Sequence, residues 1–286
     1  NRAKLARKGR RSLDVELTER GLASSDESAR EMILSGRVLV AGSISANPNR
    51  QVSPAEPVVV TDTSETESFA SRGGIKIQAA LGRFGIAING TRCLDAGAST
   101  GGFTDCLLRK GAATVTAVDV GHGLIHEKLR NDPRVHLLER TNIRKLDLAA
   151  CGGIPFDVIV ADLSFISLRL VAKSLAVDLA HPGTDLVLLV KPQFEVSKAA
   201  ASRSTGVISD PDLWTECLVT VGNSLLSHGA CIMGTMPSPI RGAKGNVEFF
   251  LHAVAQREMS ASEPRDRSHL LESIEAAVRE VSELPG

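Results

Sequence analysis

Two charged residues end apolar runs of the sequence. Asp162 follows "VIVA", and Lys191 follows "LVLLV". A charged group at the end of a buried strand is costly unless it has a partner or a function. Both runs have the length of strands, and parallel strands present their carboxyl ends at one edge of a sheet, where ligands bind. An aspartate and a lysine at neighbouring strand ends could therefore hold and activate a substrate together.

The segment "LDAGASTGGF" joins an expected strand to an expected helix. Gly97 allows a sharp turn, and Gly101 and Gly102 allow the backbone to approach a ligand closely. Ser99 and Thr100 are expected to cap the helix. The pattern is typical of a nucleotide-binding strand–turn–helix. It lacks the full G-x-G-x-x-G fingerprint of dinucleotide-binding proteins and the G-K-[ST] of a P-loop.

Two aspartates indicate which nucleotide would bind there. Asp119 ends the next apolar run, where an acidic residue can accept hydrogen bonds from both ribose hydroxyls. Asp95 lies just before the glycines, two residues ahead of Gly97, and a carboxylate there repels a pyrophosphate but tolerates a sulfonium and an ammonium group. The sequence therefore favours S-adenosylmethionine over NAD as the cofactor.

Two more charged residues become candidate site residues only when they are considered together with Asp162 and Lys191. Lys76, in "SRGGIK", opens an expected helix, and Glu248, in "GNVEFF", lies on the last expected strand. Taken singly, either could be an ordinary surface residue, and Asp162 could be a cap. Asp162 and Lys191 together are harder to explain without a shared site.

The elements that must position these residues begin at about Thr91. The first five apolar runs are separated by helix-length segments, which is typical of a parallel sheet with helices on both faces. The last two runs are closer together and could form an antiparallel edge pair. We expect an α/β, Rossmann-like, mostly parallel seven-stranded sheet. The runs are "TRCLDAG", "TVTAVDV", "VHLLER", "FDVIVADLSF", "TDLVLLVK", "ACIMGTM" and "VEFFLHAV".

The rest of the chain divides around this sheet. Residues 12–62 contain two helical patterns and two short strands, which predicts a small α+β domain. The basic segment 1–11 precedes it, and the polar segment 63–75 is a predicted linker. The sheet domain is expected over 76–256, followed by a tail with an amphipathic helix over 257–286.

Composition limits the function further. The net charge is +0, but residues 1–11 carry basic and no acidic side chains before Ser12, which suggests a polyanionic partner. The five cysteines form no C-x-x-C pair, so neither a disulfide framework nor a zinc site is expected. No apolar run approaches the roughly 20 residues that span a bilayer. We expect a cytoplasmic protein without a metal or a stable membrane association.

The motifs "SRGGIK", "DAGASTGGF", "VADLSF", "VKPQFE" and "GNVEFF" together resemble those of the FtsJ-like RNA ribose 2′-O-methyltransferases. The N-terminal domain resembles a small RNA-binding domain first described in a ribosomal protein of the small subunit. With "ERTN" and "DLSFISL", the order of domains closely resembles the TlyA family of rRNA (cytidine-2′-O)-methyltransferases, historically called hemolysins. The resemblance covers nearly the whole chain up to about residue 255.

This resemblance implies a role for each candidate residue. Lys76, Asp162, Lys191 and Glu248 would form the catalytic tetrad, with Lys191 beside the attacking 2′-oxygen as a base or as a stabiliser of negative charge. The residues implied in binding S-adenosylmethionine are Asp95, Gly97, Ala98, Ser99, Gly101, Gly102, Phe103, Asp119 and Asn142.

The implied partner is ribosomal RNA or a ribosomal subunit. The chain departs from the usual pattern of the RNA-binding domain, because Asp26 and Asn47 occupy positions where a basic residue is usual. Other basic residues could replace them. With 3% aromatic residues, backbone contacts are expected to outweigh base stacking. The candidate RNA contacts are Arg10, Arg11, Arg30, Arg37 and Arg50.

Three other functions are less well supported by the sequence. A nicotinamide-dependent oxidoreductase would need the full glycine fingerprint, which is missing. A membrane-active, hemolysin-like protein would need a spanning segment or a strongly amphipathic basic helix. A catalytically inactive rRNA-binding factor would not need all four charged residues of the tetrad.

Overall fold

The structure is a computed structural model that divides into two compact units between Arg72 and Gly73, and each unit is described by itself. Residues 1–9 of the predicted basic segment and 63–68 of the predicted linker lie outside the described residues. The described residues are 10–34, 37–40, 43–45, 47–54, 56–60, 69–196, 206–242, 245–256 and 264–283.

The N-terminal unit packs two helices against short strands. Leu13 and Leu17 of the first helix and Ile33 of the second are fully buried among valines of the strands. Gly21, which we expected to end the first helix, has a φ of +67° just after it. The strands form an antiparallel sheet of order β3-β2-β5 and a separate β1-β4 pair. The elements are β1 (Arg11–Ser12), α2 (Leu13–Glu19), α3 (Asp26–Leu34), β2 (Val38–Val40), β3 (Ser43–Ile44), β4 (Gln51–Val52) and β5 (Val58–Val60).

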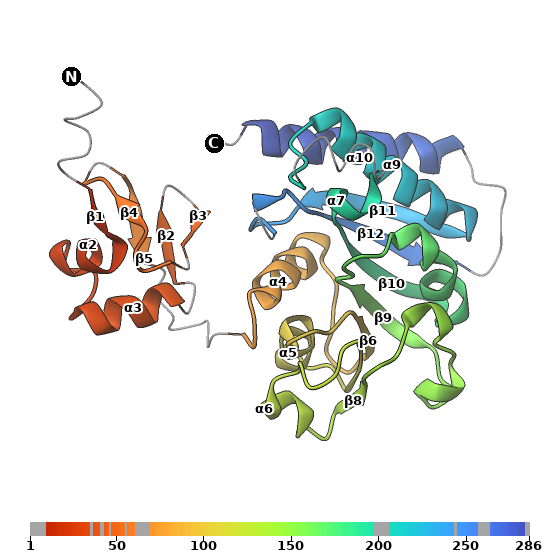
Figure 1. Ribbon diagram of the computed structural model, residues 1–286. Helices are drawn as coiled ribbons and strands as arrows, with labels where there is room; N and C mark the ends of the chain where they lie inside the picture. Colours follow the sequence, from red (N-terminus) through yellow and green to blue (C-terminus); the bar gives the residue numbers. More distant parts are fainter. Residues whose placement is uncertain are drawn as a thin grey trace. The chain divides into compact units, whose positions relative to one another are not determined.

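The larger unit contains one seven-stranded sheet of order β11-β12-β10-β9-β6-β7-β8 (Figure 1). Strands β8, β7, β6, β9 and β10 are parallel, and β12 lies antiparallel between β10 and β11. The predicted fold, including the antiparallel edge pair, is confirmed. The strands are β6 (Arg92–Ala96), β7 (Thr114–Val118), β8 (Val135–Leu138), β9 (Phe156–Ala161), β10 (Ala180–Val190), β11 (Ala230–Pro237) and β12 (Phe249–Ala255).

Helices cover both faces of this sheet, because successive strand residues point to opposite sides. Leu94, Ile159 and Leu188 lie in a core with Leu218 of α9 and Leu270 of α10. On the opposite face, helices α4 and α5 pack together (Figure 1). The helices are α4 (Gly73–Phe84), α5 (Gly102–Arg109), α6 (Glu127–Arg130), α7 (Pro192–Glu195), α9 (Pro211–Ser227) and α10 (Pro264–Glu283). Single turns are η1 (Ile143–Lys145), η2 (Ala149–Cys151), η3 (Leu168–Leu170) and η4 (Ser174–Asp178).

Among the described residues, no helix combines the length and the apolar composition required to cross a membrane.

Candidate functional site at the carboxyl edge of the sheet

Strand β10 brings the ends of three strands together at one edge. It runs parallel to β9, with Leu188 paired to Ala161, and antiparallel to β12, with Val190 paired to Phe249. The next residue along each strand is charged. Asp162 follows β9, and Lys191 follows β10. We had expected Glu248 to lie on the last strand, but it directly precedes β12.

The four predicted tetrad residues form two short ion pairs. The Lys191 Nζ lies 2.5 Å from Oδ1 of Asp162, and the Lys76 Nζ, from α4, lies 2.6 Å from Oε2 of Glu248. All four side chains are mostly covered, and that of Glu248 is only 2% exposed. Continuing the register by one residue places Lys191 opposite Glu248. The two pairs therefore lie at the same edge, although the four residues are far apart in sequence.

Gly242 leaves the space that the Glu248 carboxylate occupies. A Cβ at residue 242 would overlap with Oε1 and Cδ of Glu248. The backbone N–H of Gly242 donates to the carbonyl of Asn246, which holds Gly242 close to the start of β12. Sequence reasoning missed this residue, because the need for a glycine here depends on a tertiary contact.

The glycine turn after β6 packs against the tetrad. Gly97 has a φ of +89°, and a Cβ there would lie 2.5 Å from the carbonyl oxygen of Asp162. Gly101 has a φ of +96°, and the space beside it is filled by Leu129 and Ile125. These two glycines are required by the turn and by close packing with other segments of the chain.

The prediction that Ser99 and Thr100 cap the following helix was wrong. The N-cap of α5 is Gly101, and it makes no side-chain cap. Ser99 instead has a φ of +48°, and its backbone N–H donates to Oδ2 of Asp119 at 2.8 Å. Because Asp119 ties β7 to the turn, Ser99 does not adopt the extended conformation that a capping residue needs.

Other residues predicted to contact the cofactor lie at different depths. Phe103 is buried, with its ring packed near that of Phe250, and Ala98 is also buried. Asn142 is exposed, and its Oδ1 accepts the backbone N–H of Arg144 as the cap of η1. Gly102 begins α5 and is buried. Of the predicted set, Ser99 and Asn142 are exposed and Asp119 is half-buried.

Three aspartates, Asp95, Asp119 and Asp162, lie at this edge of the sheet, and only Asp162 has a basic partner among the described residues. Asp95 is fully buried, its Oδ2 accepts the Thr104 hydroxyl at 2.7 Å, and no described residue donates to its Oδ1. Burial raises the pKa of Asp95 to about 7, and the nearby charges of Asp162 and Asp119 raise it as well. A cationic ligand with a sulfonium and an ammonium group fits this arrangement, whereas a pyrophosphate would be repelled.

Phe165 is a candidate that sequence reasoning missed. Its side chain is 91% exposed and its φ is +65°, which is unusual for a bulky residue. The ring lies 5.1 Å from that of Phe194, and the Lys191 Nζ lies 6.0 Å from the Phe194 ring. Together with Ser99 and Arg140, it is one of the non-glycine residues of the described chain with positive φ, all in loops at this edge. Strained residues of this kind concentrate at functional sites.

The buried Glu195 holds the loop that carries Phe165. Its carboxylate accepts the hydroxyl of Ser167 at 2.6 Å and the backbone N–H of Leu168 at 2.8 Å. Burial raises the pKa of Glu195, and these hydrogen bonds oppose that effect. These hydrogen bonds join the segment after β9 to the segment after β10. Both segments lie at the carboxyl edge of the sheet.

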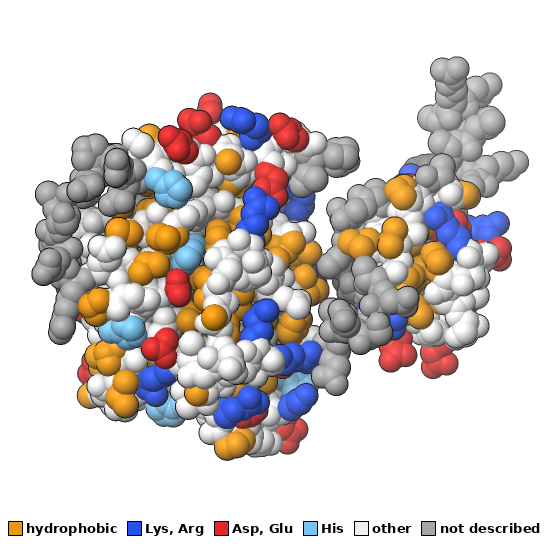
Figure 2. All heavy atoms as spheres, turned by 180° about the vertical axis from the view of Figure 1, so that it is seen from behind, with side chains coloured by type: hydrophobic (Ala, Val, Ile, Leu, Met, Phe, Trp, Pro, Cys, Tyr) orange, Lys and Arg blue, Asp and Glu red, His pale blue; other side chains and the backbone are white. Residues whose placement is uncertain are grey.

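Three of the arginines predicted to contact RNA form ion pairs within the N-terminal unit. Arg10 lies 2.8 Å from Glu56, Arg11 lies 3.0 Å from Glu19, and Arg30 lies 2.8 Å from Asp14. Figure 2 shows basic and acidic side chains side by side on the smaller unit. Arg37 lies between α3 and β2. Within the described residues, the Arg50 side chain makes no hydrogen bond or ion pair, so its guanidinium is the one most available to donate to a phosphate.

Within the described ranges, no group of three or more histidine, cysteine, aspartate or glutamate side chains is arranged to hold a metal ion.

Comparisons with known proteins cover both units. The FtsJ-like methyltransferase family matches residues 69–254, and the S4 domain matches residues 11–58. The chain is 46% identical over 267 residues to the 16S/23S rRNA (cytidine-2′-O)-methyltransferase TlyA of Mycobacterium tuberculosis, covering 93% of this chain and 97% of that protein. It is 37% identical to Hemolysin A of Brachyspira hyodysenteriae, covering 85% and 99%. A solved hemolysin-like protein from Streptococcus thermophilus superposes with a TM-score of 0.70 at 30% identity, covering 96% and 98%.

The raised pKa of Asp95 predicts how Asp95→Asn changes stability with pH. The folded state holds this proton more tightly than the unfolded state, where the pKa is about 3.9. Stability from this group is therefore fully present below about pH 4 and is lost as pH rises to about 7. The free energy of unfolding of the asparagine variant, relative to wild type, should rise by up to a few kcal/mol between pH 5 and pH 8. Urea unfolding across this range measures the difference, and a constant difference would contradict the assignment.

Proposed function

The chain belongs to the TlyA family of FtsJ-like methyltransferases, and we propose that it transfers a methyl group from S-adenosylmethionine to the ribose 2′-hydroxyl of a cytidine in ribosomal RNA. The observation that carries this proposal is the meeting of the Lys191–Asp162 and Lys76–Glu248 pairs beside the glycine turn. The 46% identity to the Mycobacterium tuberculosis enzyme over nearly the whole chain supports the nucleotide and the class of RNA.

The aspartates near the glycine turn support a binding site for the methyl donor. The Asp119 carboxylate, at the end of β7, is half-buried and can accept hydrogen bonds from the two ribose hydroxyls. Asp119, and Asp95 when it is ionised, lie at this edge without a basic partner among the described residues, and they favour a cationic ligand. When bound, S-adenosylmethionine would supply an electrophilic methyl carbon on its sulfonium.

The tetrad would prepare the ribose hydroxyl for attack. Lys191 donates to the Ser164 hydroxyl at 3.0 Å and pairs with Asp162, so we assign its ammonium to stabilising negative charge on the attacking oxygen. The ribose hydroxyl would lose its proton to water as its oxygen takes the methyl group. Asp162 would orient Lys191. Lys76, held by Glu248, would position the ribose for in-line attack, and such positioning can supply several kcal/mol of the barrier.

Two regions would contact the RNA. The exposed ring of Phe165 offers a face for stacking on an unpaired base near Lys191. The N-terminal S4 domain would bind phosphates through basic side chains such as Arg50, which contributes affinity and orientation without reading the base.

Lys191→Ala tests the catalytic assignment. Loss of the ammonium should lower the rate of methyl transfer about a hundredfold or more, as for removal of other donors to a developing oxyanion. The affinity for S-adenosylmethionine should change little. Methyl transfer to rRNA with radiolabelled donor measures the rate, and calorimetry measures the affinity. Lys173→Ala, which removes an exposed lysine paired with Asp178, is the matched control. A Lys191→Ala enzyme as active as this control would remove Lys191 from the mechanism.

Arg50→Gln tests the phosphate contact. If Arg50 neutralises one phosphate, this variant should bind an rRNA fragment more weakly at low salt. The slope of log K against log salt concentration should become shallower by about one. Gln51→Ala changes an exposed neutral neighbour and should leave the slope unchanged. An identical slope for Arg50→Gln and wild type would show that Arg50 does not contact the backbone.

A further inference from the structure

The loop that follows β7, residues 119–125, has little apolar burial to hold it. Val120 is 70% exposed and Leu124 is 49% exposed. Ile125, at the end of the loop, is buried. This loop begins with Asp119, the proposed contact for the donor ribose. Because apolar packing fixes only the end of the loop, at Ile125, the conformation of residues 119–124 must depend on polar contacts.

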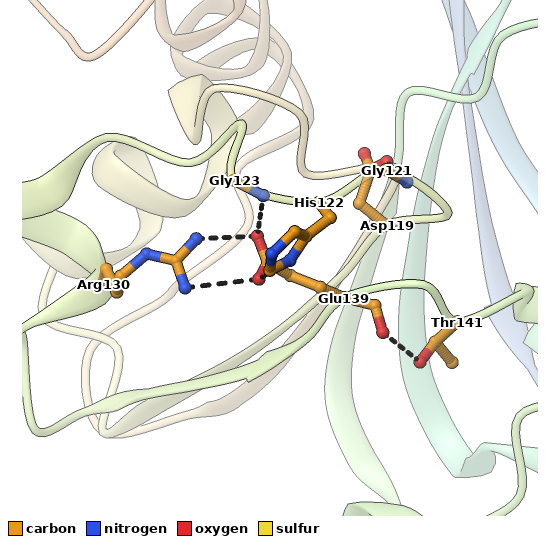
Figure 3. A network of polar contacts seen from close by, with 7 residues as sticks. All are labelled: Asp119, Gly121, His122, Gly123, Arg130, Glu139 and Thr141. Atoms are coloured by element: carbon orange, nitrogen blue, oxygen red, sulfur yellow. Dashed lines mark hydrogen bonds and ion pairs between the residues drawn. The ribbon is translucent and has the colours of Figure 1, made fainter.

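Glu139, just after β8, supplies those contacts (Figure 3). Its Oε1 accepts the backbone N–H of Gly123 at 2.6 Å, and its Oε2 lies 2.8 Å from Nδ1 of His122. The Arg130 guanidinium donates to both oxygens, at 2.7 and 3.2 Å. One carboxylate therefore joins the loop after β7, the short helix α6 and the end of β8.

The segment that carries Glu139 also contacts Asp119 itself. The Thr141 N–H donates to the Asp119 carbonyl at 2.9 Å, and the Arg140 N–H donates to the Gly121 carbonyl at 3.0 Å. The Gly121 N–H in turn donates to Oδ1 of Asp119 at 2.7 Å. Arg140 has a φ of +54°, a conformation that must be maintained by its surroundings. Displacement of Glu139 would thus be transmitted to the carboxylate that faces the donor.

We propose that Glu139 is a positioning residue for the methyl donor: it clamps the loop 119–125 in the conformation that presents Asp119 to the donor ribose. This inference rests on the proposed function, because it concerns binding of S-adenosylmethionine. The hydrogen bond from Arg130 is the largest of the effects that lower the pKa of Glu139 to about 2, so the carboxylate is charged at neutral pH.

A positioning role predicts a specific kinetic signature. Without the clamp, only part of the population would hold the loop in the binding conformation, and the apparent dissociation constant rises in inverse proportion to that part. The tetrad is carried by α4 and by segments next to β9, β10 and β12, so catalysis at saturating donor should be nearly unchanged. Glu139 would therefore affect KM for the donor rather than kcat.

The experiment compares Glu139→Gln with two other variants of the full chain. Arg130→Met removes the partner guanidinium and leaves the carboxylate in place. Asp132→Asn is the matched control, because Asp132 pairs with both Nε and Nη2 of Arg134, at 3.0 and 2.7 Å, but no described contact joins it to the loop. Calorimetry with S-adenosylmethionine gives the dissociation constant, and steady-state methyl transfer gives kcat and KM.

We expect Glu139→Gln to raise the dissociation constant and the KM for the donor roughly tenfold, with kcat within about twofold of wild type. Arg130→Met should change the same quantities in the same direction, and Asp132→Asn should match wild type. Donor affinity equal to that of Asp132→Asn in both clamp variants would overturn the inference, as would a fall in kcat at unchanged affinity. Failure of the wild-type protein itself to bind the donor would instead refute the proposed function.

Discussion

The site depends on the pairing of β10 with one parallel and one antiparallel neighbour. This pairing places Asp162 and Lys191 after adjacent strands and brings Glu248, at the start of β12, to the same edge. Lys76 then reaches Glu248 from α4. A shift of one residue in the β10–β12 register would turn Glu248 to the other face of the sheet and separate the two ion pairs.

Acidic and basic side chains occupy different parts of this edge, which correspond to the methyl donor and to the ribose acceptor. Asp95 lies in β6 and Asp119 follows β7, on the donor side where a cation would bind, and Asp95 has no basic partner among the described residues. Lys191 and Lys76 lie on the acceptor side, where negative charge would develop on the ribose oxygen. Asp162 stands between them, because it pairs with Lys191 and its backbone packs against Gly97 of the donor turn.

The sequence predicted the sheet and the charged residues at its edge because both follow from local patterns. Apolar runs interrupted by Asp162 and Lys191 are visible without a structure. Gly242, Glu139 and Glu195 could not be found this way, since their contacts depend on how loops fold back on one another and follow no local sequence pattern. The capping role expected of Ser99 and Thr100 failed for the same reason: Asp119, from another strand, determines the conformation of the turn.

A double-mutant cycle across the two ion pairs tests most directly whether they act as one site. Single-turnover methyl transfer would be measured for Asp162→Asn, for Glu248→Gln and for the double variant. Residues that act as a unit lose their effect together, so the double variant should be about as slow as the slower single variant. If the two losses instead multiply, the pairs work independently, and a single site at the end of β10 would be contradicted.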